Sequence, residues 1–191
     1  MNIKQQVVTN FGSELARFEA DWRSQVERIK ARFKEAVEGI SFPGTDFTDV
    51  PIVRVKPTSL IELLSFMKIE AGFDYDFCAD FTASDESPRE PRFDIIYNLF
   101  STTRHNRIRV KMGIAESEEA PSIRSLWAGA DWSEREIWDM FGVRFEGRPN
   151  IRRILMDNRW KGHPLRKDYS IYSYQIFPNP EPPYPEYLED E

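Results

Sequence analysis

Apolar residues recur at helical spacing early in the chain and alternate with polar residues in its middle. Between residues 13 and 38 they lie three or four positions apart, which predicts one amphipathic helix of ~39 Å. The stripe consists of Leu15, Phe18, Trp22, Val26, Ile29, Phe33 and Val37. Gly39 and the turn at 42–44 are expected to end the helix. We expect the stripe to pack on its own domain; docking on a partner is the alternative.

The middle of the chain predicts a sheet. A short strand and a helix come first, and three strands with period-2 alternation follow. These elements span 50–56, 57–72, 73–82, 93–100 and 107–114. The hairpin-like links between the last three strands favour an antiparallel meander. The predicted class is therefore α+β: a mostly antiparallel four-stranded sheet (β-α-β-β-β) with helices on one face, a long N-terminal helix and an extended C-terminal tail.

The stretch from Trp132 to Tyr169 begins as a further helix. Ser133 and Glu136 have the spacing of a capping box, and Trp132 and Ile137 that of a hydrophobic staple. Gly142 is expected to end this helix. We predict three parts of the chain: an N-terminal helical extension (1–45), an α+β core (46–143) and an extended partner-binding segment (144–191).

The C-terminal tail, 170–191, is rich in proline and aromatic residues and ends in the acidic sequence EYLEDE. Proline density disfavours helix and sheet, so an extended tail is expected. Disordered tails are usually poor in aromatic residues, and we therefore expect this one to lie along a protein surface.

Composition narrows the class of protein. The chain has 191 residues, 40% of them hydrophobic, which is enough for one domain with a core. A net charge of -6 argues against a general nucleic-acid binder, and the single cysteine, Cys78, excludes an internal disulfide. Neither a membrane span nor a secretory signal is apparent. We expect a cytosolic protein, or one peripheral on a membrane complex.

Candidate catalytic groups are better explained as structural ones. Glu134, Glu136 and Asp139 share a helix, but Glu136 is placed to cap it, and Arg135 is placed to pair with Asp139 at i, i+4. His105 and His163 are isolated, whereas a metal site needs three or four ligands. No nucleotide-binding or nucleophile motif is present. The sequence therefore assembles no enzyme site.

The stretch 144–167 is strongly basic, with eight cations against two carboxylates. Interleaved aromatic residues would suit an RNA-binding module. However, the whole chain is acidic, and Ile151, Ile154, Leu155 and Met156 run through the stretch as if buried. Because arginine is favoured in interface ion pairs, a protein interface is the more economical interpretation. RNA binding remains the alternative from another class.

The same stretch resembles a known family. Its segments EREIWDMFGV, FEGRP, RRIL and GHPLRKDY look like the signature of the C subunit, or 30 kDa-type subunit, of proton-pumping NADH:quinone oxidoreductase, respiratory complex I. The resemblance covers about residues 50–170. It departs at Arg148, where the family usually has His, and at Ser170, where it usually has Pro. An equivalent subunit of a membrane-bound hydrogenase, or of a ferredoxin- or plastoquinone-linked relative, is the alternative within the wider family.

The resemblance implies a non-catalytic structural subunit of the hydrophilic peripheral arm. FMN, iron–sulfur clusters, NADH and quinone would be held by partner subunits, and none by this chain. The chief partner would be the D (quinone-site) subunit, in a hetero-oligomer without nucleic acid that reaches the membrane only through the complex. The location would be peripheral on the cytoplasmic side of the inner membrane, or the matrix side in mitochondria.

On this interpretation the chain contributes an interface and a structural motif. The residues expected to bind the partner are Arg148, Arg152, Arg153, Trp160, His163, Arg166, Lys167 and Tyr169. Those of the structural motif are Ser133, Glu134, Arg135, Glu136, Asp139 and Gly142. For Arg152, Arg153 and Arg166 two alternatives stay open: carboxylates on a partner, or ion pairs within the chain.

Overall fold

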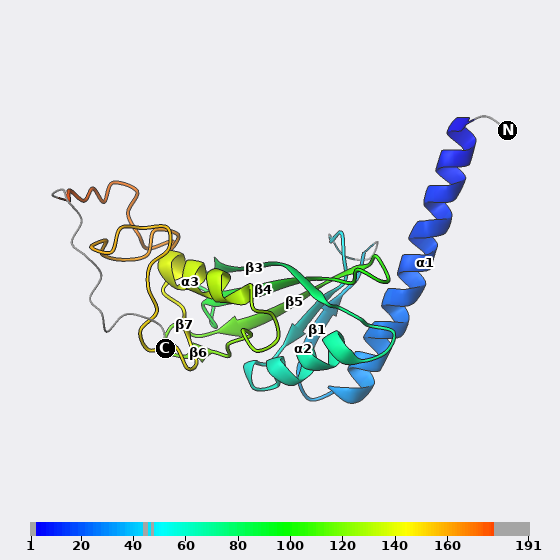
Figure 1. The fold of residues 1–191 in the computed structure, drawn as a ribbon, viewed down its shortest axis with the longest axis horizontal. Coiled ribbons are helices and arrows are strands. Elements are labelled where there is room, and N and C mark those ends of the chain that lie inside the picture. Colours follow the sequence, from blue (N-terminus) through cyan, green and yellow to red (C-terminus); the bar gives the residue numbers. More distant parts are fainter. Residues whose placement is uncertain (1–2, 44–45, 47, 178–191) are drawn as a thin grey trace.

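The computed structural model describes residues 3–43, 46 and 48–177, with side chains from residue 17 onward (Figure 1). The elements in chain order are α1 (Ile3–Arg32), β1 (Val37–Ser41), β2 (Ile52–Val55), a 3-10 turn (Pro57–Ser59), α2 (Leu60–Ile69), β3 (Phe77–Asp85), β4 (Phe93–Phe100), β5 (Arg107–Ile114), β6 (Glu119–Ala120), α3 (Ala130–Phe141) and β7 (Arg144–Phe145). The predicted α+β class is confirmed.

The main sheet has five strands in the described part of the chain, in the order β1-β2-β5-β4-β3. Strands β3, β4 and β5 form the predicted antiparallel meander. Strand β2 pairs with β5 in parallel, across the connection that contains α2. Strands β6 and β7 make a separate small parallel pair.

One face of the sheet forms the core. Along β4 and β5 the residues of that face, such as Ile95, Tyr97 and Val110, are fully buried. Buried residues of α2 and α3, including Leu63, Leu64 and Ile137, belong to the same cluster, which places these helices on that face. The opposite face carries polar side chains such as Asn98 and Lys111. The predicted alternation is therefore observed on these strands.

The first predicted helix has different bounds, and the sheet gains a strand because of it. Helix α1 runs from Ile3 to Arg32 instead of 13–38. After a turn in which the Val37 N–H donates to the Phe33 carbonyl (3.0 Å), β1 pairs antiparallel with β2. Val37 is at helical spacing from Phe33, so the apolar stripe continues past the true end of the helix. The backbone N–H and C=O groups of β1 find their hydrogen-bond partners on β2 instead of within a helix.

The C-terminal half of α1 packs on its own domain. Trp22, Val26, Ile29 and Phe33 are buried, as expected of the apolar stripe. Gln25, itself buried, donates to the Gly72 carbonyl (2.7 Å) and accepts from the Tyr75 hydroxyl (2.8 Å). In Figure 1 the N-terminal half of α1 stands clear of the sheet.

Strand β3 begins later than predicted, at Phe77 instead of residue 73. Phe73 and Tyr75 are buried in the preceding loop, where Asp74 has a positive φ of 53°. The register shifts between Cys78 and Asp80, and the Phe77 side chain is 52% exposed. Phe73 and Tyr75 continue the apolar alternation of β3 into this loop, which is why sequence periodicity placed the start of the strand too early.

Candidate functional site: a C-terminal ribbon clamped to helix α3

Residues 144–177, here called the ribbon, follow α3 and contain the predicted partner-binding residues. Apart from the short strand β7, the ribbon has no helix or strand. It lies against α3 at the end of the sheet opposite to α1 (Figure 1). Such a segment must find hydrogen-bond partners outside regular structure. The predicted tail residues 178–191 lie outside the described residues.

The start of α3 contradicts the predicted capping box. The helix begins at Ala130, its N-cap is Gly129, and no side chain caps it. Ser133 and Glu136 therefore lie inside the helix. The predicted staple is also wrong, because Trp132 is 62% exposed while Ile137 is buried. The helix therefore begins before Ser133, and its first residue, Ala130, is buried.

The end of α3 is as predicted, and the ribbon covers it. Gly142 has a φ of +75°, the left-handed conformation common at helix ends. A Cβ at Gly142 would also lie 2.6 Å from atoms of His163 and of Arg166. Glycine is therefore required both for the turn and for the close approach of the ribbon.

The ribbon satisfies the last carbonyl groups of α3, which have no partner inside the helix. His163 Nδ1 lies 3.0 Å from the Asp139 carbonyl, and the Leu165 N–H donates to the Met140 carbonyl (3.0 Å). Arg166 Nε donates to the Phe141 carbonyl. Because a carbonyl only accepts, Nδ1 of His163 carries the proton. Burial lowers the pKa of His163, so its ring is neutral at pH 7.

Two sets of contacts around buried carboxylates hold the ribbon to α3, and each is here called a clamp. Asp139 is the centre of the first clamp. Its carboxylate is fully buried, and Oδ2 accepts from the main-chain N–H groups of Ile154 (3.0 Å), Leu155 (2.8 Å) and Met156 (2.9 Å). Arg153 pairs with Oδ1. Burial acts to raise the pKa of Asp139, but these donors outweigh it, and the pKa lies below its ordinary value. The ribbon is thus wound around an ionised carboxylate.

Glu134 is the centre of the second clamp. It is fully buried and accepts from the Ser122 hydroxyl (2.9 Å), the Ile123 N–H (2.9 Å) and Arg148 (3.2 Å). Burial raises the pKa of Glu134 above its ordinary value, and these donors only limit the rise. Arg148 is also buried and pairs with Asp131 (3.0 Å). The position that departs from the family pattern therefore holds the start of the ribbon to α3.

Arg135 does not make the predicted pair with Asp139. Its guanidinium donates to the main-chain carbonyls of Arg152 (3.2 Å) and Arg153 (3.0 Å) instead. The Asp139 carboxylate is taken by Arg153. Helical spacing allows an i, i+4 pair, but the ribbon offers both groups partners with less exposure to water.

A third set of ion pairs joins the ribbon to the β3–β4 hairpin. Arg166 and Arg92 share Glu116, with distances of 2.5 and 2.7 Å, and Arg92 also pairs with Asp85 (2.8 Å) and Asp168 (2.9 Å). The Arg92 guanidinium holds the pKa of Asp85 well below its usual range. Lys167 donates its main-chain N–H to Asp85 (2.9 Å). Sequence patterns did not indicate Arg92, Asp85 and Glu116, because partners so distant in the chain leave no local signal.

The far end of the ribbon folds on Trp160. The Trp160 ring lies 6.4 Å from that of Tyr169 and 6.0 Å from that of Phe177. Gln175 accepts from the Lys161 N–H (3.0 Å) and donates to the Lys161 carbonyl (2.9 Å). Residues 159–177 are thereby closed into a loop with a small aromatic centre.

Large apolar side chains remain on the surface of the ribbon. Leu155 is 60% exposed, which contradicts the expectation that it is buried, and Leu165 is 55% exposed. The most exposed are Ile171, Tyr172, Tyr174 and Ile176. The tail aromatics were expected at a protein surface, but the leucines and isoleucines were not singled out. The available signal was the apolar or aromatic character of four of the six residues in 171–176.

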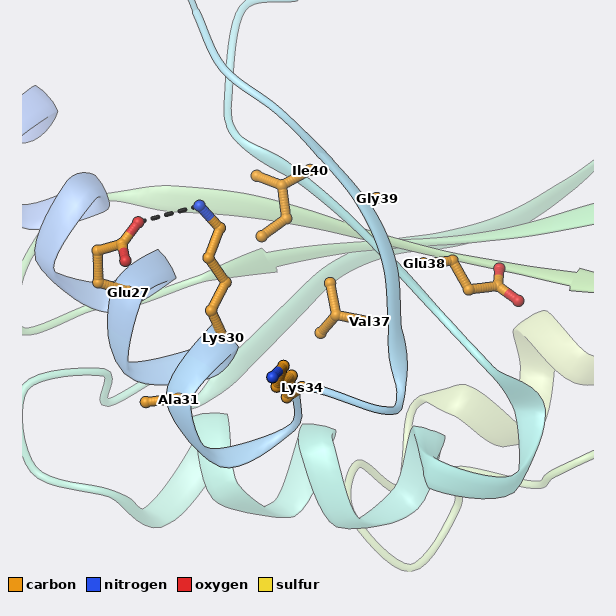
Figure 2. Close-up of a pocket in the computed structure, with 8 residues that line it drawn as sticks. All are labelled: Glu27, Lys30, Ala31, Lys34, Val37, Glu38, Gly39 and Ile40. Atoms are coloured by element: carbon orange, nitrogen blue, oxygen red, sulfur yellow. Dashed lines mark hydrogen bonds and ion pairs between the residues drawn. The ribbon is translucent and has the colours of Figure 1, made fainter.

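A surface groove lies apart from the ribbon. A groove of about 600 Å³ lies between α1 and β1, lined by Lys30, Lys34, Val37 and Ile40 among others (Figure 2). It is remote from the ribbon, and Lys30 is paired with Glu27 (3.0 Å). In the part of the chain that the structure describes, no group of His, Cys, Asp and Glu gathers as a metal site. No helix among the described residues has the length and apolar character needed to cross a bilayer.

Comparison with known proteins gives a consistent result. Residues 53–175 match the family described as respiratory-chain NADH dehydrogenase, 30 kDa subunit. A C-type subunit (C 2) of the NADH-quinone oxidoreductase of Rhizobium etli (strain CIAT 652) is 35% identical over 152 residues, covering 80% of this chain and 79% of the relative. The mitochondrial 30.4 kDa subunit of NADH-ubiquinone oxidoreductase of Neurospora crassa is 42% identical over 122 residues, or 64% of this chain and 43% of that protein.

A solved structure shares the fold. A chain of the membrane-bound sulfane sulfur reductase, an archaeal respiratory membrane complex, superposes with a TM-score of 0.60 at 20% identity, covering 78% of this chain and 86% of that one. The family match spans β2 through most of the ribbon, and therefore both carboxylate clamps. The predicted resemblance is confirmed: this chain belongs to the family of 30 kDa (C-type) subunits of respiratory-chain NADH dehydrogenase.

Proposed function

We propose that this chain is a non-catalytic structural subunit of the hydrophilic peripheral arm of a proton-translocating NADH:quinone oxidoreductase. The observation that carries the proposal is that the chain itself encloses the two buried carboxylates of α3. Glu134 and Asp139 have no exposed surface, and main-chain N–H groups and arginines of the same chain occupy their oxygens. A carboxylate that is enclosed in this way is a fixed structural element and meets no substrate.

The redox chemistry of the complex would belong to partner subunits. NADH, FMN, the iron–sulfur clusters and quinone are assigned to them, and none to this chain. Its single thiol supports this assignment, since burial raises the pKa of Cys78 to about 11 and keeps it protonated. The chain's contribution is to hold neighbouring subunits in place while electrons pass from NADH to quinone.

The chief partner in this proposal is the D subunit, which carries the quinone site. The ribbon and the tail, 144–191, would form the interface, the core 46–143 would present it, and the segment 1–45 would be an extension. The complex would place the chain on the cytoplasmic side of the inner membrane, or on the matrix side in mitochondria. Arg148, Arg153 and Arg166 have carboxylate partners within the chain, which favours a role behind the contact surface for them.

Affinity purification of the tagged full chain from detergent-solubilised membranes tests the proposal. We expect flavin- and cluster-bearing subunits to co-purify with NADH:quinone oxidoreductase activity. Recovery of the chain alone, under conditions in which the rest of the complex stays intact, would overturn it. Loss of that activity in membranes lacking the chain, with restoration by the tagged copy, is the second expected result.

A further inference from the structure

The groove between α1 and β1 opens onto a free edge of the main sheet. Strand β1 ends the strand order, and within the described residues no second strand pairs with its outer edge. Four consecutive residues of β1, 37–40, line the groove, whereas one face of a strand would contribute only every second residue. A Cβ at Gly39 would meet no atom within 4 Å. Main-chain N–H and C=O groups at this edge are therefore open to pairing with an extended segment.

The walls of the groove are apolar and basic. In Figure 2 the side chains of Val37 and Ile40 point into it from β1, and that of Glu38 points away. On α1, Lys30 is neutralised by a glutamate of the same helix (3.0 Å), whereas Lys34 has no ion pair among the described residues. The uncompensated charge in the groove is positive, so its chemistry suits an extended segment with apolar and acidic side chains.

The end of the same chain has this chemistry. Residues 178–191 lie outside the described residues, and their sequence, PNPEPPYPEYLEDE, contains five carboxylate side chains and no lysine or arginine. The last six residues, EYLEDE, are free of proline, so each has a main-chain N–H to donate. We propose that this proline-free end adds to the five-residue strand β1 as a further strand and fills the groove. This contact goes beyond the proposed function, because it forms in the chain before any partner is bound.

Alternation gives the proposed strand a face that fits the groove. In an extended segment Glu186, Leu188 and Asp190 share one face, with the apolar residue between the two acidic ones. Leu188 would lie against the apolar side chains of β1, and a carboxylate on either side of it would be in reach of Lys34. The groove therefore offers this face both an apolar floor and an unpaired cation.

The chain after the ribbon is long enough to reach the groove. The fourteen residues that follow Phe177 span up to ~46 Å when extended. The ribbon and α1 lie at opposite ends of the sheet, and the eight residues of β4 span roughly 27 Å (Figure 1). The groove residues, 27–40, and the tail also both lie outside the stretch 53–175 that matches the family. The contact is thus a feature of this chain, separate from what the family model describes.

Disulfide trapping in the full-length purified chain tests the inference. The background is Cys78→Ser, which removes the native thiol. The test chain adds Glu189→Cys in the tail and Ala31→Cys, an exposed position that lines the groove. The matched control combines Glu189→Cys with Ala20→Cys, an exposed position on the same helix that does not line the groove. Mass spectrometry of non-reduced peptides follows disulfide formation within one chain after addition of oxidised glutathione.

We expect the Ala31→Cys chain to close at least tenfold faster than the Ala20→Cys chain. Adding Lys34→Glu should slow closure at least threefold, whereas Lys161→Glu, an exposed lysine on the ribbon, should stay within twofold. Equal rates for the two cysteine positions overturn the inference. Disulfides found only between separate chains overturn it as well, because they place the tail on a second copy.

A competing peptide distinguishes strand addition from attraction between charges. Excess synthetic EYLEDE should slow closure of the Ala31→Cys chain at least threefold. The same peptide with N-methyl groups on its main chain keeps every charge but cannot donate, so it should have no effect. Equal competition by both peptides overturns strand addition. The proposed function is tested separately by co-purification of the wild-type chain, so either result can fail without the other.

Discussion

The two carboxylates buried on α3 hold the ribbon by different means. Asp139, near the end of the helix, accepts main-chain N–H groups of consecutive ribbon residues together with Arg153. Glu134, in the first half, accepts a hydroxyl, a single main-chain N–H and Arg148. Both side chains have no exposed surface, yet the pKa of Asp139 is lowered and that of Glu134 is raised.

The difference shows that burial alone does not fix the charge of a carboxylate. Fixed main-chain donors favour the ionised form, and where they converge they outweigh the cost of desolvation. At Glu134 fewer donors converge, and desolvation is the larger effect. The Asp139 clamp therefore depends on negative charge, whereas the Glu134 clamp tolerates a neutral side chain.

The largest effect is expected for Asp139→Asn. Oδ2 faces main-chain N–H groups and Oδ1 faces Arg153, so the amide nitrogen of asparagine meets donors in either orientation. Breaking a buried, fully bonded charge pair costs ~3–5 kcal/mol. Urea unfolding of the purified chain at pH 7 measures the loss. A cost below ~1 kcal/mol would contradict a charge-dependent clamp at this position.

Glu134→Gln is the matched substitution and should cost less, about 1–2 kcal/mol. The glutamine oxygen can still accept from Ser122 and from the Ile123 N–H, and Arg148 retains Asp131 at 3.0 Å. The same urea experiment, run in parallel, gives the difference between the two variants. An equal or larger cost for Glu134→Gln would reverse the comparison.

The two variants should also differ in the pH dependence of stability. The folded pKa of Asp139 lies below its unfolded value of ~3.9, so its contribution is present above ~3.9 and is lost as pH falls through the folded pKa. The folded pKa of Glu134 lies above its unfolded value of ~4.3, so its contribution is present below ~4.3 and is lost as pH rises through the folded pKa.

The free energy of unfolding of each variant, measured between pH 3 and 6, separates these contributions. As pH falls, the advantage of the wild-type chain over Asp139→Asn should shrink. The difference in free energy of unfolding between the wild-type chain and Glu134→Gln should grow as pH falls over the same range. That growth should be smaller than the cost of either substitution at pH 7. Parallel curves for the two variants would mean that the carboxylates titrate alike.

Sequence patterns predicted the parts of the fold that local periodicity controls. Strands β4 and β5 were placed correctly from their largely alternating apolar residues, and Gly142 ends α3 as its conformational freedom suggested. Strand β1 was missed because Val37 extends the helical stripe of α1, while pairing with β2 is a contact distant in sequence. The start of β3 was placed too early because Phe73 and Tyr75, which are buried in the preceding loop, continue its apolar alternation.

The site was predicted in outline but not in its contacts. The carboxylates of the acidic motif were assigned a structural role, and the ribbon was assigned to a partner. However, Arg153 and Arg166 pair with Asp139 and Glu116, partners that no local spacing reveals. These two arginines, which suggested an acidic partner, therefore have carboxylate partners within the chain. The exposed isoleucines of the ribbon received too little weight.

The smallest effect is expected at Ser133, where a capping box seemed complete. Ser133 lies inside α3, with no side-chain cap at the start of the helix, and Glu136 is exposed. Alanine has the higher helix propensity, so Ser133→Ala should change the free energy of unfolding by less than ~0.5 kcal/mol, whereas loss of a true N-cap costs about 1 kcal/mol. Urea unfolding resolves this difference, and a loss of 1 kcal/mol or more would mean that α3 starts at Ser133 in solution. In that case residues 130–132 would be outside the helix, and the Glu134 clamp would sit at a helix N-terminus, where the dipole favours the ionised carboxylate and would weaken its contrast with Asp139.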